Sequence, residues 1–275
     1  MEKVQVIVTG ASGSIGSAAV RAMAQRGFSV IMACRNLEKG ERVKSEILSF
    51  LPEADLKLMQ VDMASLKSVK HFADTLKDSG IRLAGVFNNA GTMNRNFTLS
   101  EDGFERTIAV NYIAPYFLTR SLLPLFQPDA HIVNMVSLTC RMAKIDNSFF
   151  EKTEKDFSQL GVYGDSKLAL LLFTVALSQK TEFHVNMADP GVVNSNMISL
   201  GRWFDPLADA LFRPFCKSPE KGAIPAINAL TTDVYGKYFV GENYRNVNQK
   251  YMSNPKIEWL WETTEKLLFQ KGLSF

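Results

Sequence analysis

The chain has 275 residues, of which 46% are hydrophobic and 21% are charged. These fractions are those of an average soluble globular domain, so they exclude a disordered chain, a collagen-like repeat and a coiled-coil rod. The formal net charge of +3 predicts no nucleic-acid partner. Cys34, Cys140 and Cys216 form no CxxC motif, so we interpret them as small buried side chains in a reducing compartment.

Short apolar runs alternate along the chain with longer amphipathic patterns, which indicates strands alternating with helices. We expect strands at residues 4–8, 28–34, 56–61, 83–87, 131–137, 183–188 and 236–241. We expect helices at residues 17–26, 38–50, 65–77, 102–126, 160–179, 218–230 and 255–270. Pro115 should bend the helix that contains it. This alternation predicts an α/β domain with a doubly wound, mostly seven-stranded parallel sheet and helices on both faces.

The whole chain, residues 1–275, is expected to form a single domain, because no linker-like stretch precedes residue 195. Within it, residues 1–195 are the expected cofactor-binding and catalytic core, and residues 236–275 the last strand and helix. Residues 196–235 are the expected substrate lid region; its apolar part, 197–215, could equally be an amphipathic core segment. The apolar run at 168–177 is shorter than the ~20 residues of a membrane span. We therefore expect a cytoplasmic protein without a signal peptide or a transmembrane segment.

The first chemical signal is the sequence TGASGSIG, from Thr9 to Gly16, which follows a strand and precedes a helix. Phosphate groups bind at helix N-termini because unpaired N–H groups and the helix dipole point there. Close approach of a phosphate also requires residues with little side chain, as this stretch has. A glycine cluster can also be an ordinary turn, but its place between strand and helix favours a dinucleotide site.

The second expected strand ends in Cys34-Arg35-Asn36, with no acidic residue at positions 33–37. In dinucleotide-binding folds, an acidic residue at this point binds the ribose 2′-hydroxyl, whereas an arginine accommodates a 2′-phosphate. Arg35 therefore favours NADP(H) over NAD(H). The alternative is a solvated arginine at a strand end.

Tyr163 and Lys167 are four residues apart in an expected helix, so they share one face with about 5–6 Å between their Cβ atoms. An ammonium group beside a phenol stabilises the phenolate and lowers its pKa. Such a pair can exchange a proton with a carbonyl or hydroxyl group. The alternative is a surface pair without function.

In their order along the chain, these motifs resemble the short-chain dehydrogenase/reductase family. The residues that carry the resemblance are Thr9-Gly10…Gly16, Asn88–Gly91, Asn111, Ser137 and Tyr163…Lys167. The resemblance implies a single-domain Rossmann fold and four catalytic residues. Tyr163 would be the general acid or base, and Lys167 would lower its pKa and hold the nicotinamide ribose. Ser137 would bind the substrate oxygen, and Asn111 would anchor a water molecule connecting Lys167 to solvent.

The resemblance also implies a full set of residues for an NADP(H) cofactor. They are Gly10, Ser12, Gly13, Ser14, Ile15, Gly16, Arg35, Asn36, Asp62, Met63, Asn89, Ala90, Gly91, Tyr163, Lys167, Pro190, Gly191, Val192 and Ser195. One departure is that Ser14 stands at the family's middle glycine, with Gly13 one place early. A second is the 26-residue separation of Ser137 and Tyr163, which resembles the retinol dehydrogenase and protochlorophyllide reductase branch.

From these residues we expect an NADP(H)-dependent oxidoreductase of apolar aldehydes, ketones or alcohols. The alternatives are a reductase of 3-oxoacyl or sugar-like carbonyls and a non-catalytic NADP-binding sensor. His71, His131 and His184 lack metal-ligand spacing, so we expect no metal site and structural roles for the last two. The family often forms homodimers or homotetramers through the helices expected at 102–126 and 160–179, although a terminal helix could cover those faces.

Overall fold

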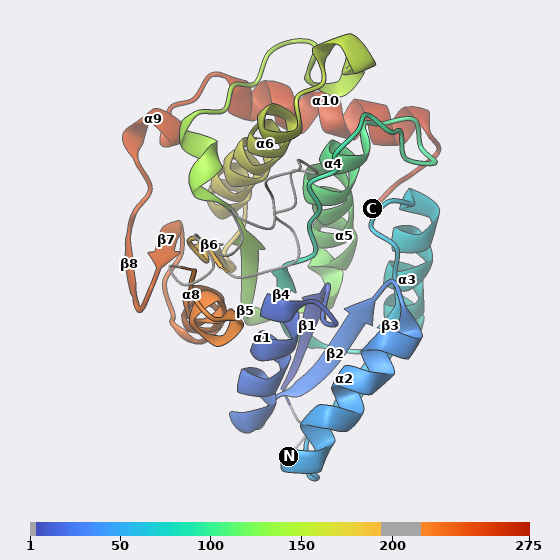
Figure 1. Cartoon of the computed structure of the whole chain (residues 1–275), viewed down its shortest axis with the longest axis vertical. Helices are drawn as coiled ribbons and strands as arrows, with labels where there is room; N and C mark the ends of the chain where they lie inside the picture. Colours follow the sequence, from blue (N-terminus) through green and yellow to red (C-terminus); the bar gives the residue numbers. More distant parts are fainter. Residues whose placement is uncertain (1–3, 194–215) are drawn as a thin grey trace, which may run out of the picture.

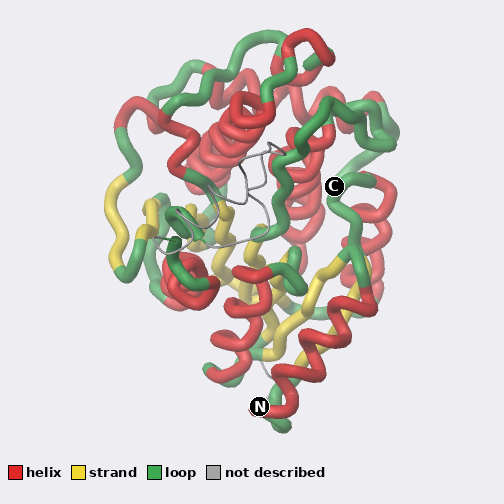
Figure 2. The backbone as a smooth tube through the Cα atoms, in the orientation of Figure 1, coloured by secondary structure: helices red, strands yellow, loops and turns green. Residues whose placement is uncertain are grey.

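The structure is a computed structural model of the chain and describes residues 4–193 and 216–275. It is a doubly wound α/β domain with one central sheet between two helical layers (Figures 1 and 2). The fold class predicted from the sequence is therefore confirmed. The lid expected at 197–215 and the expected cofactor residue Ser195 lie outside the described residues.

The sheet has eight strands in the order β3-β2-β1-β4-β5-β6-β7-β8. They are β1 (Gln5–Thr9), β2 (Ser29–Cys34), β3 (Leu56–Gln60), β4 (Leu83–Asn88), β5 (Phe126–Met135), β6 (His184–Asp189), β7 (Lys237–Val240) and β8 (Asn243–Asn246). The first seven are parallel, as predicted, and β8 pairs antiparallel with β7 at the edge. All four residues of β8 are exposed, so it lacks the apolar alternation by which strands are predicted.

Two helical layers cover the sheet. One consists of α1 (Ser14–Gln25), α2 (Leu37–Phe50) and α8 (Pro219–Thr231). The other contains α3 (Leu66–Asp78), α4 (Arg106–Ile108), α5 (Ala114–Leu122), α6 (Gln159–Lys180), α9 (Gln249–Met252) and α10 (Lys256–Gln270). Because both faces are covered, all six residues of β2 are buried, as the apolar strand sequences predict.

The prediction of one long helix at 102–126 is wrong. The structure has α4, a π-helical turn at Ala109–Ile113, α5 and a short 3-10 turn at Leu123–Leu125. Pro115 has no N–H, so the carbonyl of Asn111 lacks the donor that an α-helix supplies four residues later. The chain meets this constraint with a π turn and not with a simple bend. Strand β5 then begins at Phe126, five residues before the expected start.

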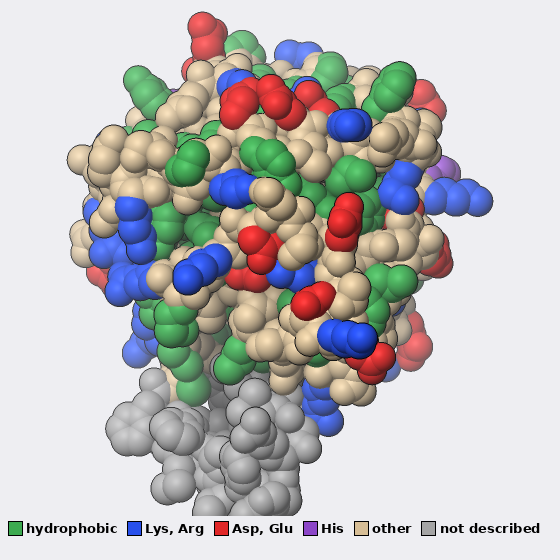
Figure 3. All heavy atoms as spheres, turned by 90° about the horizontal axis from the view of Figure 1, so that it is seen from above, with side chains coloured by type: hydrophobic (Ala, Val, Ile, Leu, Met, Phe, Trp, Pro, Cys, Tyr) green, Lys and Arg blue, Asp and Glu red, His purple; other side chains and the backbone are tan. Residues whose placement is uncertain are grey.

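Helix α10 lies across α5 and α6 as an outer layer (Figure 1). The hydroxyl oxygens of Tyr112 and Thr264 are 2.7 Å apart. Arg120 of α5 is 2.6 Å from the carboxylate of Glu265 and lies over the ring of Trp261 at 4.5 Å. On the face that includes α10, acidic, basic and hydrophobic side chains are interspersed (Figure 3). Helix α10 thus covers part of the outer surface of α5 and α6.

Among the described residues, one helix is long and apolar enough to cross a membrane, and it is α6. Its most apolar window has a mean hydropathy of 1.5, but 78% of that window is buried inside the domain. Burial of this kind is also found in the central helix of a water-soluble domain. The bounds of α6 lie within one residue at each end of the helix expected at 160–179.

Candidate active site

A cavity of about 600 Å³ opens at the carboxyl ends of the parallel strands. Ligands of doubly wound sheets bind at this edge. The cavity is lined by every expected cofactor residue that the structure describes. These are Gly10, Ser12, Gly13, Ser14, Ile15, Gly16, Arg35, Asn36, Asp62, Met63, Asn89, Ala90, Gly91, Tyr163, Lys167, Pro190, Gly191 and Val192. Ser137 also lines it, whereas the side chain of Asn111 lies behind its wall.

The glycine turn packs so closely on itself and on the segment after β4 that Gly10 and Gly16 leave no room for a Cβ atom. Gly10 has φ +63°, and a Cβ there would lie 2.9 Å from the Cα of Ala90. A Cβ at Gly16 would overlap the carbonyl oxygen of Gly10. Gly13 is the N-cap of α1 and Ser14 its first residue, so the N–H groups of the first helical turn face the cavity. The serine at the family's middle glycine therefore leaves the turn intact.

Thr9 joins this turn to the segment that follows β4. Its hydroxyl oxygen accepts the N–H groups of Asn89 and Ala90, both at 3.0 Å. The side-chain amide of Asn89 donates to the carbonyl of Thr9 at 2.9 Å. These bonds between neighbouring strands fix the position of the cavity wall at Asn89–Gly91.

The adenosine end of the cavity carries two cationic side chains. Arg35 follows β2, and Lys39 lies in the first turn of α2. Asn36 caps that helix by accepting the Lys39 N–H at 2.7 Å. Sequence reasoning missed Lys39, although its position four residues after Arg35 was a usable signal. The two cations and the α2 N-terminus together favour an anionic group here.

At the opposite end, the side chains of Ser137 and Tyr163 both line the cavity. Ser137 follows β5, and Tyr163 comes from the N-terminal part of α6. Burial raises the pKa of Tyr163 to about 12, and the nearby Ser137 hydroxyl acts in the lowering direction. Tyr163 is therefore a phenol at neutral pH, the form that can donate a proton.

Lys167 lies one helical turn further along α6 and is buried. Its ammonium donates to the carbonyl of Met135 at 2.7 Å and lies 6.0 Å from the centre of the Tyr163 ring. Burial lowers the pKa of Lys167 to about 8, while Cys140 and Asp189 oppose that shift. The expected effect of Lys167 on the Tyr163 phenol stays a prediction, because here the ammonium is bonded to the strand carbonyl.

Asn111 is fully buried in the π-helical turn. Its side-chain amide donates to the carbonyl of Thr92 at 2.9 Å and to the hydroxyl of Ser166 at 3.0 Å. Its side-chain oxygen accepts the Thr92 N–H at 2.8 Å. The side chain thus holds the segment after β4, and the main-chain carbonyl is the group that Pro115 leaves without a helical donor. The water-anchoring role expected for Asn111 stays a prediction.

A buried carboxylate beneath this end was not found from the sequence. Asp189, at the end of β6, accepts the hydroxyl of Tyr238 at 2.5 Å and the N–H of Gly191 at 2.9 Å. Gly191 has φ +72°, so these bonds fix a turn that favours glycine. The sequence gives no local sign of this pair, because Tyr238 belongs to β7 and lies 49 residues from Asp189 in the chain.

The mouth of the cavity beside Tyr163 is apolar. Leu138, Leu160 and Val192 line it with relative exposures of 40%, 57% and 55%. Large side chains that stay this exposed within a cavity wall are suited to contact with an apolar ligand.

The family model for the short chain dehydrogenases matches residues 4–202. The chain belongs to this family, in its retinol dehydrogenase-like branch. Retinol dehydrogenase 12 of Mus musculus is 33% identical over 273 residues, with 96% of this chain and 85% of the relative covered. The chloroplastic short-chain dehydrogenase TIC 32 A of Brassica napus is 30% identical, with 95% and 88% covered.

Solved structures share the fold. An uncharacterised protein from Mycobacterium paratuberculosis superposes with a TM-score of 0.77 at 25% identity, covering 96% of this chain and 92% of that one. A short chain dehydrogenase from Shigella flexneri complexed with NADP has a TM-score of 0.67 at 23% identity, covering 87% and 97%.

Proposed function

We propose that this chain is an NADP(H)-dependent oxidoreductase that interconverts apolar aldehydes or ketones with the corresponding alcohols. The observation that carries the proposal is one cavity with three parts: a cationic adenosine end, the Ser137–Tyr163 pair above buried Lys167, and an apolar mouth. The family supplies the class of oxidoreductase, and the residues of this cavity support the finer assignment.

The residues present fit a phosphorylated dinucleotide. The glycine turn at the N-terminus of α1 lines the cavity, and Arg35 with Lys39 offers a cationic pair to a 2′-phosphate. Asp62, beyond β3, also lines this end, and its carboxylate accepts the N–H of Ala64 at 2.9 Å. A bound nicotinamide cofactor supplies or accepts the hydride. The NADP complex of the Shigella flexneri structure supports only the suitability of the fold.

In the reducing direction, Tyr163 donates its phenolic proton to the substrate oxygen. Its high pKa in the buried site keeps that proton in place at neutral pH. Ser137 donates a hydrogen bond to the same oxygen, where negative charge develops. Lys167, buried below the pair, contributes a positive charge that stabilises the same region and the phenolate left behind. In the oxidising direction, the phenolate removes the proton.

The substrate class follows from the mouth of the cavity. Leu138, Leu160 and Val192 offer side-chain carbon and no hydrogen-bonding groups. An alkyl chain leaves water when it contacts them, which stabilises the complex by about 0.8 kcal/mol per buried methylene. A 3-oxoacyl or sugar-like substrate would leave its polar groups without partners at these side chains.

The decisive experiment measures NADPH oxidation with aldehydes and ketones of increasing chain length. We expect kcat/KM to rise with chain length and Tyr163→Phe to lower kcat by about 10²–10⁴-fold. The Kd for NADPH should be unchanged in that variant. Tyr244→Phe is the matched control, because Tyr244 is an exposed tyrosine of β8.

Three outcomes would overturn the assignment. Undiminished turnover by Tyr163→Phe would exclude the proton-transfer role. Tight NADPH binding without turnover across the panel would indicate a non-catalytic binding protein. A preference for 3-oxoacyl or sugar carbonyls would replace the apolar substrate class.

We further propose that the chain does not form the dimer that its family makes through helices equivalent to α5 and α6. The support is α10, which places Glu265 and Trp261 against Arg120 of α5 and Trp261 against Phe173 of α6. Light scattering should give the mass of one chain; a dimer that persists at micromolar concentration would contradict this.

A further inference from the structure

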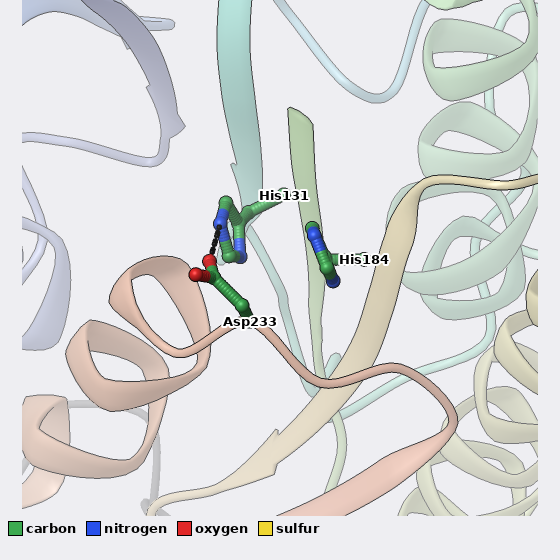
Figure 4. A group of neighbouring side chains, drawn as sticks. All are labelled: His131, His184 and Asp233. Atoms are coloured by element: carbon green, nitrogen blue, oxygen red, sulfur yellow. Dashed lines mark ion pairs between the residues drawn. The ribbon is translucent and has the colours of Figure 1, made fainter. Parts of the chain in front are cut away.

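Two histidines and an aspartate meet at the edge of the sheet opposite the catalytic cavity (Figure 4). His131 on β5 and His184 at the start of β6 are direct partners in the parallel register. Their rings stack with centroids 4.7 Å apart and an interplanar angle of 20°. Asp233 lies between α8 and β7 and turns its carboxylate toward His131.

The three side chains present a set of metal-ligating atoms. One ring nitrogen of each histidine and one carboxylate oxygen lie within 4.8 Å of one another. The Nε2 atom of His131 is 3.5 Å from an Oδ1 atom of Asp233. Imidazole with carboxylate is a ligand combination that zinc and similar divalent transition metals accept.

The hydrogen bonding of His131 leaves its outward nitrogen without a hydrogen. Its Nδ1 atom is 3.2 Å from the carbonyl oxygen of Ala229, and only a protonated nitrogen can bond a carbonyl. In the neutral ring, Nε2 then directs a lone pair at the Asp233 carboxylate, so two acceptors face each other.

His184 carries an independent sign of a missing partner. Its Nδ1 atom is buried and has no hydrogen-bond partner in the structure. A buried polar atom without a partner costs about 1–3 kcal/mol. A cation at the edge of the stacked rings, in the plane of each ring and beside the carboxylate, would separate the opposed acceptors of His131 and Asp233 and give His184 a partner.

We propose that His131, His184 and Asp233 form a binding site for a divalent transition-metal ion of the zinc type. Zinc bonds of about 2.0–2.1 Å in tetrahedral geometry require ligand atoms about 3.3 Å apart. The His131–Asp233 distance of 3.5 Å already approaches this value, and the Asp233 side chain is 86% exposed and free to rotate. Water completes the coordination, and the Ala229 carbonyl orients the His131 ring.

The position of the site defines its role. The ion would add a link between the turn after α8 and strands β5 and β6, beside the hydrogen bond from the Asn186 side chain to the Val234 carbonyl at 2.6 Å. It lies at the strand beginnings, whereas the cavity lies at the strand ends, so the metal would stabilise the domain and take no part in hydride transfer.

The test uses the full chain without a histidine tag, stripped with a chelator and titrated with Zn²⁺. We expect one equivalent of tightly bound zinc by calorimetry and by elemental analysis after dialysis, together with a higher Tm. His184→Gln should weaken zinc binding by at least 100-fold and Asp233→Asn by about 10-fold. His71→Gln should retain the full affinity, because His71 is an exposed histidine of α3 outside the cluster.

Two further measurements keep the result unambiguous. Asp233 is exposed, so its variant should fold, and unchanged NADPH binding would show that it has. Cys216→Ser tests whether that thiol supplies the site instead. Failure of the wild-type chain to bind zinc at 100-fold molar excess would overturn the proposal, as would full binding retained by both His184→Gln and Asp233→Asn.

Discussion

The two ends of the catalytic cavity are built differently. The cofactor end is fixed by hydrogen bonds among Thr9, Asn89 and Ala90 and by glycines that allow close approach of the backbone. The substrate end is formed by Leu160 and Val192, which are more than half exposed. The cofactor end is suited to one ligand by its charge and shape. The substrate end offers an apolar surface that suits a class of ligands.

The chemistry lies where the two ends meet. Ser137, Tyr163 and Lys167 come from β5 and α6, and burial shifts the pKa values of the tyrosine and the lysine in opposite directions. A fixed cofactor end and an adaptable substrate end therefore share one rigid proton-transfer group. This division predicts large effects for changes at the junction, smaller effects at the cofactor end and the smallest effects at the mouth.

Lys167→Met at the junction should have the largest effect, a fall in kcat/KM of about 10²–10⁴-fold. In the wild type, burial lowers the Lys167 pKa to about 8, so the ammonium loses its charge as pH rises above that value. Carbonyl reduction should therefore decline on the alkaline side with a midpoint near 8. The variant should lack this limb. An identical alkaline limb in the variant would assign it to another group.

Gly16→Ala should disrupt the cofactor end, because the new methyl group would overlap the carbonyl oxygen of Gly10. We expect the free energy of unfolding to fall by about 1–3 kcal/mol and NADPH affinity to fall with it. Gly164→Ala is the control, since its Cβ would make an ordinary 3.4 Å contact with Ala143. Denaturant unfolding measures the free energy of unfolding, and NADPH titration measures the affinity. Equal stability of the two variants would show that position 16 does not require glycine.

Arg35→Ala should reduce the preference of the cofactor end for NADPH over NADH. Loss of a charged hydrogen bond to a 2′-phosphate costs about 1.5–3 kcal/mol, roughly a 10- to 150-fold weaker Kd for NADPH. The Kd for NADH should change little. Arg42→Ala is the control, because Arg42 pairs with Glu38 on the exposed face of α2. A wild-type preference for NADH would remove the basis of the prediction.

Asp189→Asn should move the alkaline limb of activity to lower pH. The carboxylate raises the pKa of Lys167 against the effect of burial, so its removal lets the lysine lose its proton earlier. Tyr238→Phe removes the hydrogen bond to Asp189 but keeps the negative charge of the carboxylate. The alkaline limb of this variant's activity should therefore not move to lower pH. A limb that moves equally in both variants would indicate a positional effect and not an electrostatic one.

Leu160→Ser at the mouth should have the smallest effect. We expect kcat/KM for a long-chain aldehyde to fall by about 4- to 15-fold, the loss of one to two buried methylenes. A short-chain aldehyde should be unaffected. Leu99→Ser serves as the control, because Leu99 is exposed to 51% and does not line the cavity. A uniform fall for all substrates would show that the mouth does not select chain length.

Features encoded by local spacing could be predicted from the sequence. The glycine turn and the Tyr163–Lys167 pair each lie within a few residues, and the structure places them as expected. Periodicity likewise gave the seven parallel strands. The resemblance added Ser137 and Asn111, whose places in the fold now show that only the serine faces the cavity.

Features that depend on strand neighbours could not be predicted. Asp189 and Tyr238 meet because β6 and β7 are adjacent, and His131 and His184 meet because β5 and β6 are in register. Spacing along the chain argued against a metal site, yet register brought both imidazoles together. The π-helical turn before Pro115 was missed because a proline predicts a disturbed helix and not the way in which the backbone accommodates it.

The outer position of α10 has a consequence for how the chain folds during synthesis. Tyr112 and Arg120 find partners in Thr264 and Glu265, about 150 residues later. Until residues 256–270 leave the ribosome, the apolar side chains of α5 and α6 that they cover stay exposed to water. Such late, long-range contacts slow folding and leave a partly folded chain prone to association. A nascent chain stalled before α10 should therefore bind holdase chaperones until its synthesis resumes.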